Sequence, residues 1–384
     1  MRFPLSQEIS FFDKNSLHFN KQDTVFAVLL VLFFLLFPFT ALLPYSRASL
    51  GILLLIPLYL SARRGMAFRM PSAFFLFEAT ALAGLLKPYA ARDTLLFFLL
   101  SLAFFIPSVP TFSICRLTHC LALASGVCGT LAIIQQLSGK SASHWSDAER
   151  FGALARAGAV FSNPNVLGIF LAVGVILSLD AIRVRLSAGG ASLYLLTLFL
   201  SLGGLLFTYS RGAWLGAGCG ILLYAVRLAH PKRRKKTAHA FIPVFSPLAR
   251  VASLFSPDSS MLYRLSLWKS TLSASPLRLL FGAGEGRRAL FSLLTPTLAS
   301  GLERIEHTHS LYLHLLCAEG VFGLVLFLIL ALSRLSDKRV PPCISGAILS
   351  ILVYGIFDDP LYSGQIGVLL WLLLGVGYAS TRST

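Results

Sequence analysis

The chain has 384 residues and a mean hydropathy of +0.76, with 56% hydrophobic and only 13% charged residues. Because soluble domains carry about 25% charged residues, this composition excludes an ordinary soluble protein and favours a membrane protein built from apolar helices. The net charge of +17 is scattered through the segments between apolar runs, which favours the positive-inside bias of membrane proteins over nucleic-acid binding.

Apolar segments recur along the whole sequence and predict an all-α, polytopic transmembrane bundle of about twelve spans. Segment 48–61 is short, and Pro243, Pro247 and Arg250 interrupt segment 237–256, so an eleven-span arrangement stays open. The predicted spans are 24–43, 48–61, 72–89, 94–110, 117–138, 164–182, 190–208, 212–229, 237–256, 311–333, 341–357 and 362–379.

Lysines and arginines in the connecting loops predict the orientation. With twelve spans, every second loop is basic, and the most basic is His230-Pro-Lys-Arg-Arg-Lys-Lys236. These loops mark the cytoplasmic side, so both termini are expected there. Residues 1–23 then form a cytoplasmic N-terminal segment, and residues 24–379 form a single transmembrane domain. The long loop 257–310, before the tenth span, is expected outside the cytoplasm.

Some basic residues are predicted on the outer side against this bias. They include Arg156, in the loop 139–163, and Arg264, in the loop 257–310. Anion binding outside the cytoplasm is one explanation, and the solvated face of a long loop is the other. Arg211 lies at the boundary between two apolar runs, where a charge usually faces a cavity or a partner, with snorkelling to lipid headgroups as the alternative.

Two histidines, His307 and His309, precede the tenth span. Imidazole accepts a proton near neutral pH. On a helix, residues two apart point about 200° away from each other, which predicts one working base rather than a zinc pair. A structural role at a helix start is the alternative. Asp358-Asp359 follows the eleventh span, where it is expected to orient a histidine, pair with an arginine or mark the helix end.

The sequence lacks the common motifs of metal and cofactor enzymes. It has no GxSxG, HExxH or P-loop, and no DxD motif on the predicted outer side. Its six cysteines lie in apolar segments without a CxxC pair, so packing is their expected role. The sequence therefore predicts no metal and no cofactor.

Short motifs follow one another in residues 150–375. They are Phe161-Ser-Asn-Pro-Asn165, Tyr209-Ser-Arg-Gly212, the Arg264-to-Trp268 segment with Gly282-Ala-Gly284, and His307-Thr-His-Ser-Leu-Tyr-Leu313 with Glu319-Gly320. In this order and on one predicted side of the membrane, they resemble the O-antigen ligase and O-antigen polymerase superfamily of bacterial membrane proteins. That family usually has Asn at the position of Ser310, a departure that keeps a hydrogen-bonding side chain.

The resemblance implies a metal-independent glycosyltransferase of polysaccharide and cell-wall biosynthesis, multi-pass in the bacterial cell membrane. The implied donor is a glycan on undecaprenyl pyrophosphate, and the acceptor is a hydroxyl of a glycan or lipid-linked glycan. Membrane lipids are further partners, and nucleic acid is not. Ligase and polymerase are both open. The alternative function is a transporter or flippase of a lipid-linked anionic glycan, disfavoured because no inverted repeat is visible.

The residues and the resemblance together predict a division of roles. His309 accepts the proton of the acceptor hydroxyl, with His307 as the second choice. Arg211 and Arg264 bind the pyrophosphate through bidentate hydrogen bonds, with Arg156 as a third candidate. Supporting positions are expected at Tyr209, Ser210, Asn163, Asn165, Trp268, Ser310, Tyr312 and Asp358.

Overall fold

The structure is a computed structural model, and it describes residues 21–62, 71–108, 113–139, 143–144, 155–186, 189–229, 259–297, 305–376 and 378. This part of the chain confirms the predicted all-α class, with fifteen α-helices and one two-stranded ribbon. The ninth predicted span and nearly all of the N-terminal segment lie outside the described residues. The number of spans stays a prediction.

In the first half of the chain, the described residues form seven long or short α-helices, three 3₁₀ helices and two short strands. They are α1 (Lys21–Leu36), η1 (Phe37–Leu42), α2 (Ser46–Ala62), α3 (Ser72–Leu82), η2 (Ala83–Leu86), α4 (Ala91–Ser101), η3 (Leu102–Ser108), α5 (Ile114–Leu137), β1 (Ser143–His144), β2 (Ala155–Arg156), α7 (Pro164–Arg185) and α8 (Ala191–Phe207). The strands β1 and β2 pair antiparallel.

The second half holds one more long helix and then a group of short ones. Its elements are α9 (Arg211–Leu228), α11 (Ser259–Leu272), α12 (Pro276–Phe281), α13 (Arg287–Leu294), η5 (Thr295–Thr297), α14 (Leu311–Ala318), α15 (Gly320–Ser336), α16 (Pro342–Tyr354) and α17 (Gly364–Gly375). All predicted spans within the described residues therefore contain helix.

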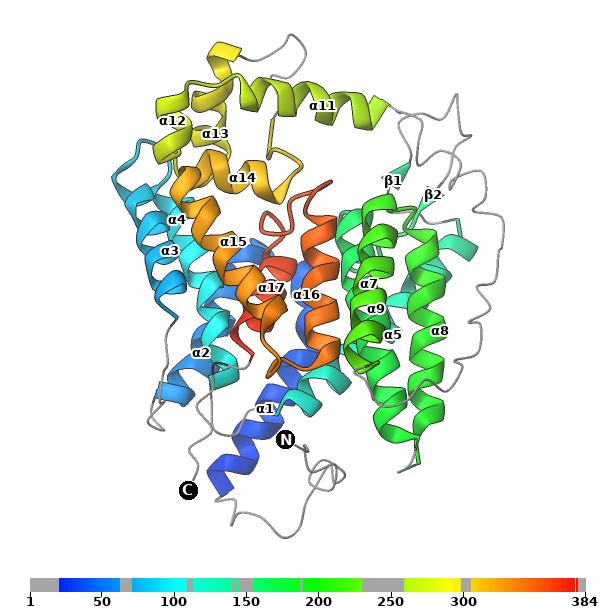
Figure 1. Cartoon of the computed structure of the whole chain (residues 1–384). Helices are drawn as coiled ribbons and strands as arrows, with labels where there is room; N and C mark the ends of the chain where they lie inside the picture. Colours follow the sequence, from blue (N-terminus) through cyan, green and yellow to red (C-terminus); the bar gives the residue numbers. More distant parts are fainter. Residues whose placement is uncertain are drawn as a thin grey trace.

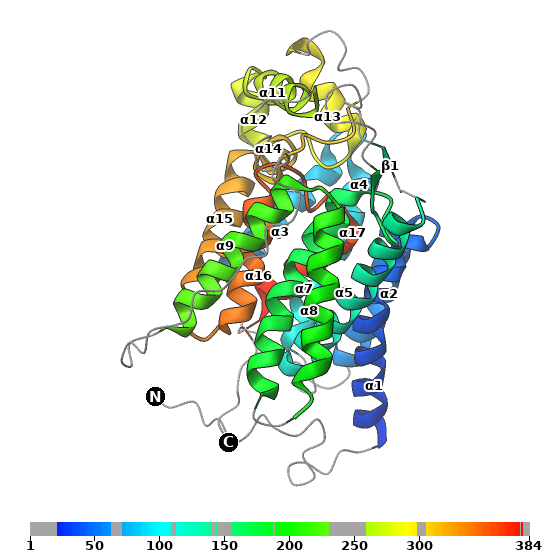
Figure 2. The same cartoon turned by 90° about the vertical axis from the view of Figure 1, so that its right-hand side faces the viewer.

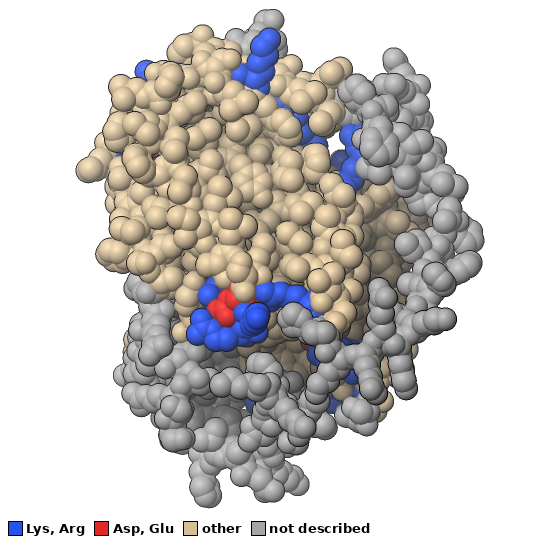
Figure 3. All heavy atoms as spheres, viewed as in Figure 1, with Lys and Arg blue, Asp and Glu red and all other residues tan. Residues whose placement is uncertain are grey.

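Two of the described helices, α5 and α7, are long and apolar enough to cross a membrane. Others are shorter: the 13 residues of α16 rise only about 20 Å, against a bilayer core of about 30 Å. Figure 3 shows a broad uncharged face, with basic side chains and a carboxylate gathered at its lower edge. A charge-free band bordered by charged side chains is typical of helical membrane proteins.

The helices form an upright bundle with a layer of short helices across one end (Figures 1 and 2). In the bundle, α5, α7 and α8 pack against one another, and α9 packs along α16. The helices α11 to α14 form the layer at the upper end. The bundle interior is apolar, with the ring of Trp371 fully buried among Phe74, Phe77, Phe97 and Phe327.

Close backbone contact between α9 and α16 sets the position of the upper helix ends. A Cβ atom at Gly220 would lie 2.5 Å from the carbonyl oxygen of Gly346, and one at Gly346 would lie 2.6 Å from that of Gly220. Only glycine fits at both positions, as in the small-residue contacts of membrane helices. This contact holds the start of α9, at Arg211, beside the end of α16, at Tyr354.

The prediction of one continuous helix over 311–333 is wrong, because the chain breaks between α14 and α15. Gly320 has a φ of +76°, which glycine adopts without strain. The backbone N–H groups of Ala283 and Gly284 donate to the carbonyls of Cys317 and Ala318, at 2.7 and 2.9 Å. The loop between α12 and α13 therefore satisfies the last carbonyls of α14. The helix α14 lies across the end of the bundle (Figure 1).

We expect Gly220→Leu to separate α9 from α16, because its side chain would overlap the backbone of α16. The midpoint of thermal unfolding of the protein in detergent or nanodiscs should fall by several degrees or the protein should fail to accumulate. Gly218→Leu is the matched control, since a Cβ atom there meets no atom within 4 Å. Equal stability of the two variants would contradict the tight contact.

Candidate active site

The candidate site lies at the upper end of the bundle, where the starts of α7 and α9 meet the end of α16. Asn163 precedes α7 as its N-cap, and its side-chain oxygen accepts a hydrogen bond from the backbone N–H of Asn165 at 2.8 Å. Pro164 occupies the first turn, where its missing N–H costs nothing. This cap fixes the start of α7, so Asn163 supports the helix that carries Asn165 and does not itself line the cavity described below.

Asn165 joins an arginine to a carboxylate. Arg156 donates from Nη2 to the side-chain oxygen of Asn165 at 2.7 Å, and from Nε to the carbonyl of Thr208 at 2.8 Å. Asn165 in turn donates from Nδ2 to Asp358 Oδ2 at 3.0 Å. Burial and the nearby charge of Arg264 lower the pKa of Arg156 to about 10, which still leaves it a cation at neutral pH. The ribbon and α7 thus hold Arg156 beside Asp358.

A cavity of about 150 Å³ opens at this point, and three arginines face it. Its lining residues are Arg156, Asn165, Tyr209, Ser210, Arg211, Gly212, Ser260, Arg264, Tyr354, Phe357 and Asp358. With about 30 Å³ for each water molecule, the cavity has room for a small anionic group. Three guanidinium groups against one carboxylate favour an anion over a cation in this cavity.

The second and third arginines come from two different helices, α9 and α11. Arg211 is the first residue of α9, after Tyr209, whose φ of +50° is strained for a side-chain-bearing residue. Arg264 extends from α11, with its Nη2 4.0 Å from Asp358 Oδ2. The Nε of Arg264 is buried and has no hydrogen-bond partner among the described residues. A buried unpaired donor beside a cavity is a feature that a bound anion would satisfy.

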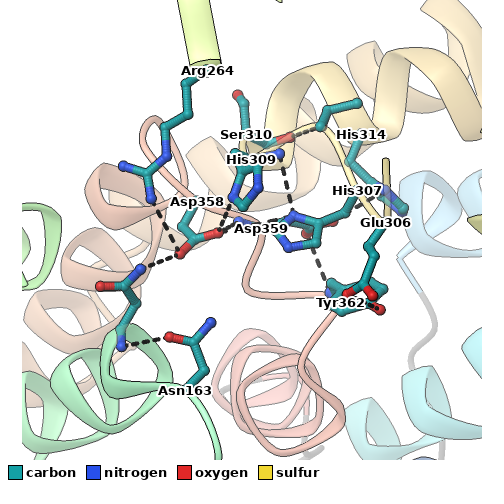
Figure 4. Close-up of polar contacts among 12 residues, drawn as sticks. Asn163, Arg264, Glu306, His307, His309, Ser310, His314, Asp358, Asp359 and Tyr362 are labelled. Carbon is teal, nitrogen blue, oxygen red and sulfur yellow. Dashed lines mark hydrogen bonds and ion pairs between the residues drawn. The ribbon is translucent and has the colours of Figure 1, made fainter. Parts of the chain in front are cut away.

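Asp358 connects this cavity to the histidines (Figure 4). Its Oδ1 lies 3.3 Å from Nδ1 of His309, and its Oδ2 accepts a hydrogen bond from the hydroxyl of Tyr354 at 3.1 Å. Burial alone would raise the pKa of Asp358, but the hydrogen bond from His309 and the charge of Arg264 hold it well below its usual range. Because an ionised carboxylate only accepts, Nδ1 of His309 carries the hydrogen and Nε2 is left to accept a proton.

His307 packs against His309 instead of pointing away from it. The two ring centroids are 4.0 Å apart, and the backbone N–H of His309 donates to Nδ1 of His307 at 3.2 Å. The expectation of opposed histidines on a helix is therefore wrong: both precede α14, and His309 has a φ of +51°. Burial and the neighbouring His309 lower the pKa of His307 to about 3, so it stays neutral. His309, paired with a carboxylate, is the better candidate for a general base.

The O-antigen ligase family model matches residues 196–328. Residues 196–328 form an O-antigen ligase domain. The protein is therefore a glycosyltransferase-type enzyme with the helical character of a membrane protein. No curated protein matches the chain.

The O-antigen ligase domain contains both histidines and two of the arginines, Arg211 and Arg264. Arg156, Asn165 and Asp358 lie outside the matched stretch, yet the fold brings them to the same cavity. The candidate site is thus built from both the domain and the segments that flank it, which are β2, the start of α7 and the loop after α16.

Two of the predicted supporting residues attach elements of the site to one another without lining the cavity, and a third precedes α14. Trp268 donates from Nε1 to the carbonyl of Thr308 at 3.1 Å and so attaches α11 to the histidine segment. Tyr312 donates to the carbonyl of Leu352 at 2.8 Å and attaches α14 to α16. Ser310 is the N-cap residue of α14, without a side-chain capping bond.

The O-antigen ligase domain also has a buried histidine that the sequence analysis missed. His314, on α14, lies between Glu285 and Asp359, with nitrogen–oxygen distances of 3.1 Å to each carboxylate. An ionisable residue inside the apolar run Leu313-His-Leu315 was the available signal. The signal was incomplete, because Glu285 and Asp359 are far from His314 in the sequence.

The histidine pair and Asp358 also have the geometry of a metal site. One ligand atom from each of His307, His309 and Asp358 lies within 4.8 Å of the others. The two histidines do not point away from each other, so helix geometry no longer argues against a metal here. That the enzyme needs no metal stays a prediction.

We expect transfer activity to survive EDTA, because Arg211 and Arg264 already supply the positive charge that a metal would bring to the cavity. The measurement is the rate of glycan transfer by the purified protein before and after chelation, with elemental analysis of the same samples. A stoichiometric metal whose removal abolishes transfer would contradict the metal-free mechanism and make the histidine pair its ligands.

Proposed function

We propose that this O-antigen ligase-type enzyme transfers a glycan from a polyprenyl pyrophosphate to an acceptor hydroxyl outside the cytoplasm. The observation that carries the proposal is the three-arginine cavity with a histidine–carboxylate pair at its edge. The arginines would neutralise the charge of a pyrophosphate leaving group, and the His309–Asp358 pair would accept the proton of an attacking hydroxyl.

The arginine cavity binds the pyrophosphate of the donor. Guanidinium groups bind phosphate oxygens through paired hydrogen bonds. Arg211 is also the first residue of α9, at the end of the helix where the helix dipole favours an anion. The donor's lipid chain would remain among the apolar helices while its pyrophosphate enters the cavity. This arrangement stabilises the charge that develops as the sugar leaves.

His309 accepts the proton of the acceptor hydroxyl at Nε2. The hydroxyl oxygen then forms a bond to the anomeric carbon, and the bond between that carbon and the pyrophosphate oxygen breaks. Polyprenyl pyrophosphate leaves with the bonding electron pair, and the proton resides on His309 until water removes it. Asp358 holds the imidazole through Nδ1 and stabilises its protonated form. Direct displacement of this kind inverts the anomeric centre.

We expect Arg211→Lys to lower transfer by at least about tenfold, because lysine keeps the charge but loses the paired donors. Arg183→Lys is the matched control: Arg183 pairs with Asp180 near the end of α7, away from the cavity. Transfer by purified variants, at equal protein level, is the measurement. Near-normal activity of Arg211→Lys would contradict bidentate pyrophosphate binding.

We expect His309→Ala to lower transfer by about 10²–10⁴-fold, the usual contribution of general base catalysis. Asp358→Asn should also lower it, because an amide no longer favours a protonated imidazole. Binding of undecaprenyl pyrophosphate should be kept by His309→Ala, which separates a lost base from a lost fold. If His309→Ala transfers normally and His307→Ala does not, His307 is the base.

A glycan ladder from cells lacking the gene, complemented with wild type or His309→Ala, tests the physiological role. A knockout that leaves single lipid-linked repeat units indicates a polymerase. Long chains that stay on the lipid carrier indicate a ligase. Movement of the lipid-linked glycan across the membrane without a new glycosidic bond would instead indicate a transporter.

A further inference from the structure

A second cavity lies next to the histidine pair, and the mechanism above does not use it. Its volume is about 140 Å³. Its lining residues are Arg47, Asp93, Gly284, Glu285, Gly286, Arg287, Leu290, Glu306, His314, Cys317, Ala318 and Tyr362. These come from α2, α4, the short upper helices and the α16–α17 loop, so the cavity is a junction between the bundle and its upper layer.

The histidine pair connects the two cavities (Figure 4). The ring of Tyr362, in the second cavity, stacks on His307 with a centroid distance of 4.4 Å and an interplanar angle of 27°. His307 contacts His309, and His309 contacts Asp358 of the arginine cavity. A molecule in the second cavity is thus one aromatic ring and one imidazole away from the proposed base.

The two cavities differ in charge. The arginine cavity has three guanidinium groups against one carboxylate. The second cavity has three carboxylates, on Asp93, Glu285 and Glu306, against two guanidinium groups and the imidazole of His314, which its two carboxylate neighbours favour in the charged form. The carboxylates would repel an anion and the arginines would repel a cation, so a neutral polar molecule suits this cavity.

The polar groups of the second cavity are held in place. His314 contacts both carboxylate oxygens of Glu285 at 3.1 Å. Burial opposes the ionisation of Glu285, but the charge of His314 lowers its pKa, so the side chain remains an acceptor. The hydroxyl of Tyr362 donates to Glu306 at 3.3 Å. The Nε of Arg47 is buried without a hydrogen-bond partner among the described residues.

We propose that the second cavity binds an uncharged sugar residue of the acceptor glycan. Sugar hydroxyls both donate and accept, so carboxylates and guanidinium groups can bind them at once. Tyr362 lines the cavity with its ring 5.9 Å from the guanidinium of Arg47, so it helps to hold that donor at the cavity wall. This assignment rests on the proposed function, since it places the acceptor on one side of His309 and the donor pyrophosphate on the other. It specifies a neutral sugar in the part of the acceptor that Tyr362 and His307 separate from the base, rather than a uronic acid or a phosphorylated sugar.

The first test is saccharide binding by the full chain in nanodiscs, measured by saturation-transfer NMR with galactose, N-acetylglucosamine and glucuronic acid. We expect a signal for one or both neutral sugars and a weaker one for glucuronic acid. Tyr362→Ala and Glu306→Gln should abolish or strongly reduce the neutral-sugar signal. Tyr59→Ala is the matched control, because its exposed side chain lies about 18 Å along α2 from Arg47.

Undecaprenyl pyrophosphate binding by the same samples separates the two cavities. Tyr362→Ala should keep this binding, and Arg211→Lys should weaken it while keeping the saccharide signal. In transfer assays, Glu306→Gln should raise the acceptor KM about tenfold or more, with a smaller change in the donor KM.

Neutral-sugar signals that both second-cavity variants leave unchanged, or a preference for glucuronic acid, would overturn the assignment. A saccharide signal that depends on Tyr362 in a protein that transfers no glycan would support the sugar site and contradict the proposed function. The two proposals can therefore fail independently.

Discussion

The burial of Asp358 is the constraint on which the site depends. Its carboxylate is 5% exposed and needs partners, and it finds them on Asn165 of α7, Arg264 of α11, His309 and Tyr354 of α16. An uncompensated buried charge costs about 3–5 kcal/mol, so these segments are held together by the need to satisfy one group. The contact with Asp358 also fixes the tautomer of His309 and the position of the Arg264 side chain.

Its neighbour Asp359 organises the other side of the site. Consecutive residues after α16 direct their carboxylates to different histidines, Asp358 to His309 and Asp359 to His314. The backbone N–H of Asp359 also donates to the side chain of Asp358 at 3.0 Å. One short loop therefore supports both cavities, and its position depends on the glycine contact that holds α16 against α9.

Backbone strain coincides with this centre. Tyr209, in the arginine cavity, and His309, beside Asp358, both have positive φ values, of 50° and 51°. Such conformations cost about 1–3 kcal/mol each unless the surroundings compensate. Here the helix start at Arg211 and the bond from His309 to Asp358 provide that compensation. These two strained residues therefore hold the proposed base, His309, and the neighbouring Arg211 at defined positions.

The sequence by itself determined the helical class, most helix positions and the residue types of the site. Apolar runs, short motifs and ionisable residues in apolar surroundings are local signals, and they led to Arg156, Arg211, Arg264, His309 and Asp358. Only the tertiary structure decided which of these residues meet. The continuous apolar run over 311–333 did not reveal the break at Gly320, because the last carbonyls of α14 accept hydrogen bonds from residues more than 30 positions away. The contact between His307 and His309 depends on the positive φ of His309, which the sequence did not indicate. The Glu285–His314–Asp359 cluster and the second cavity depend on contacts between distant segments, which no local pattern records.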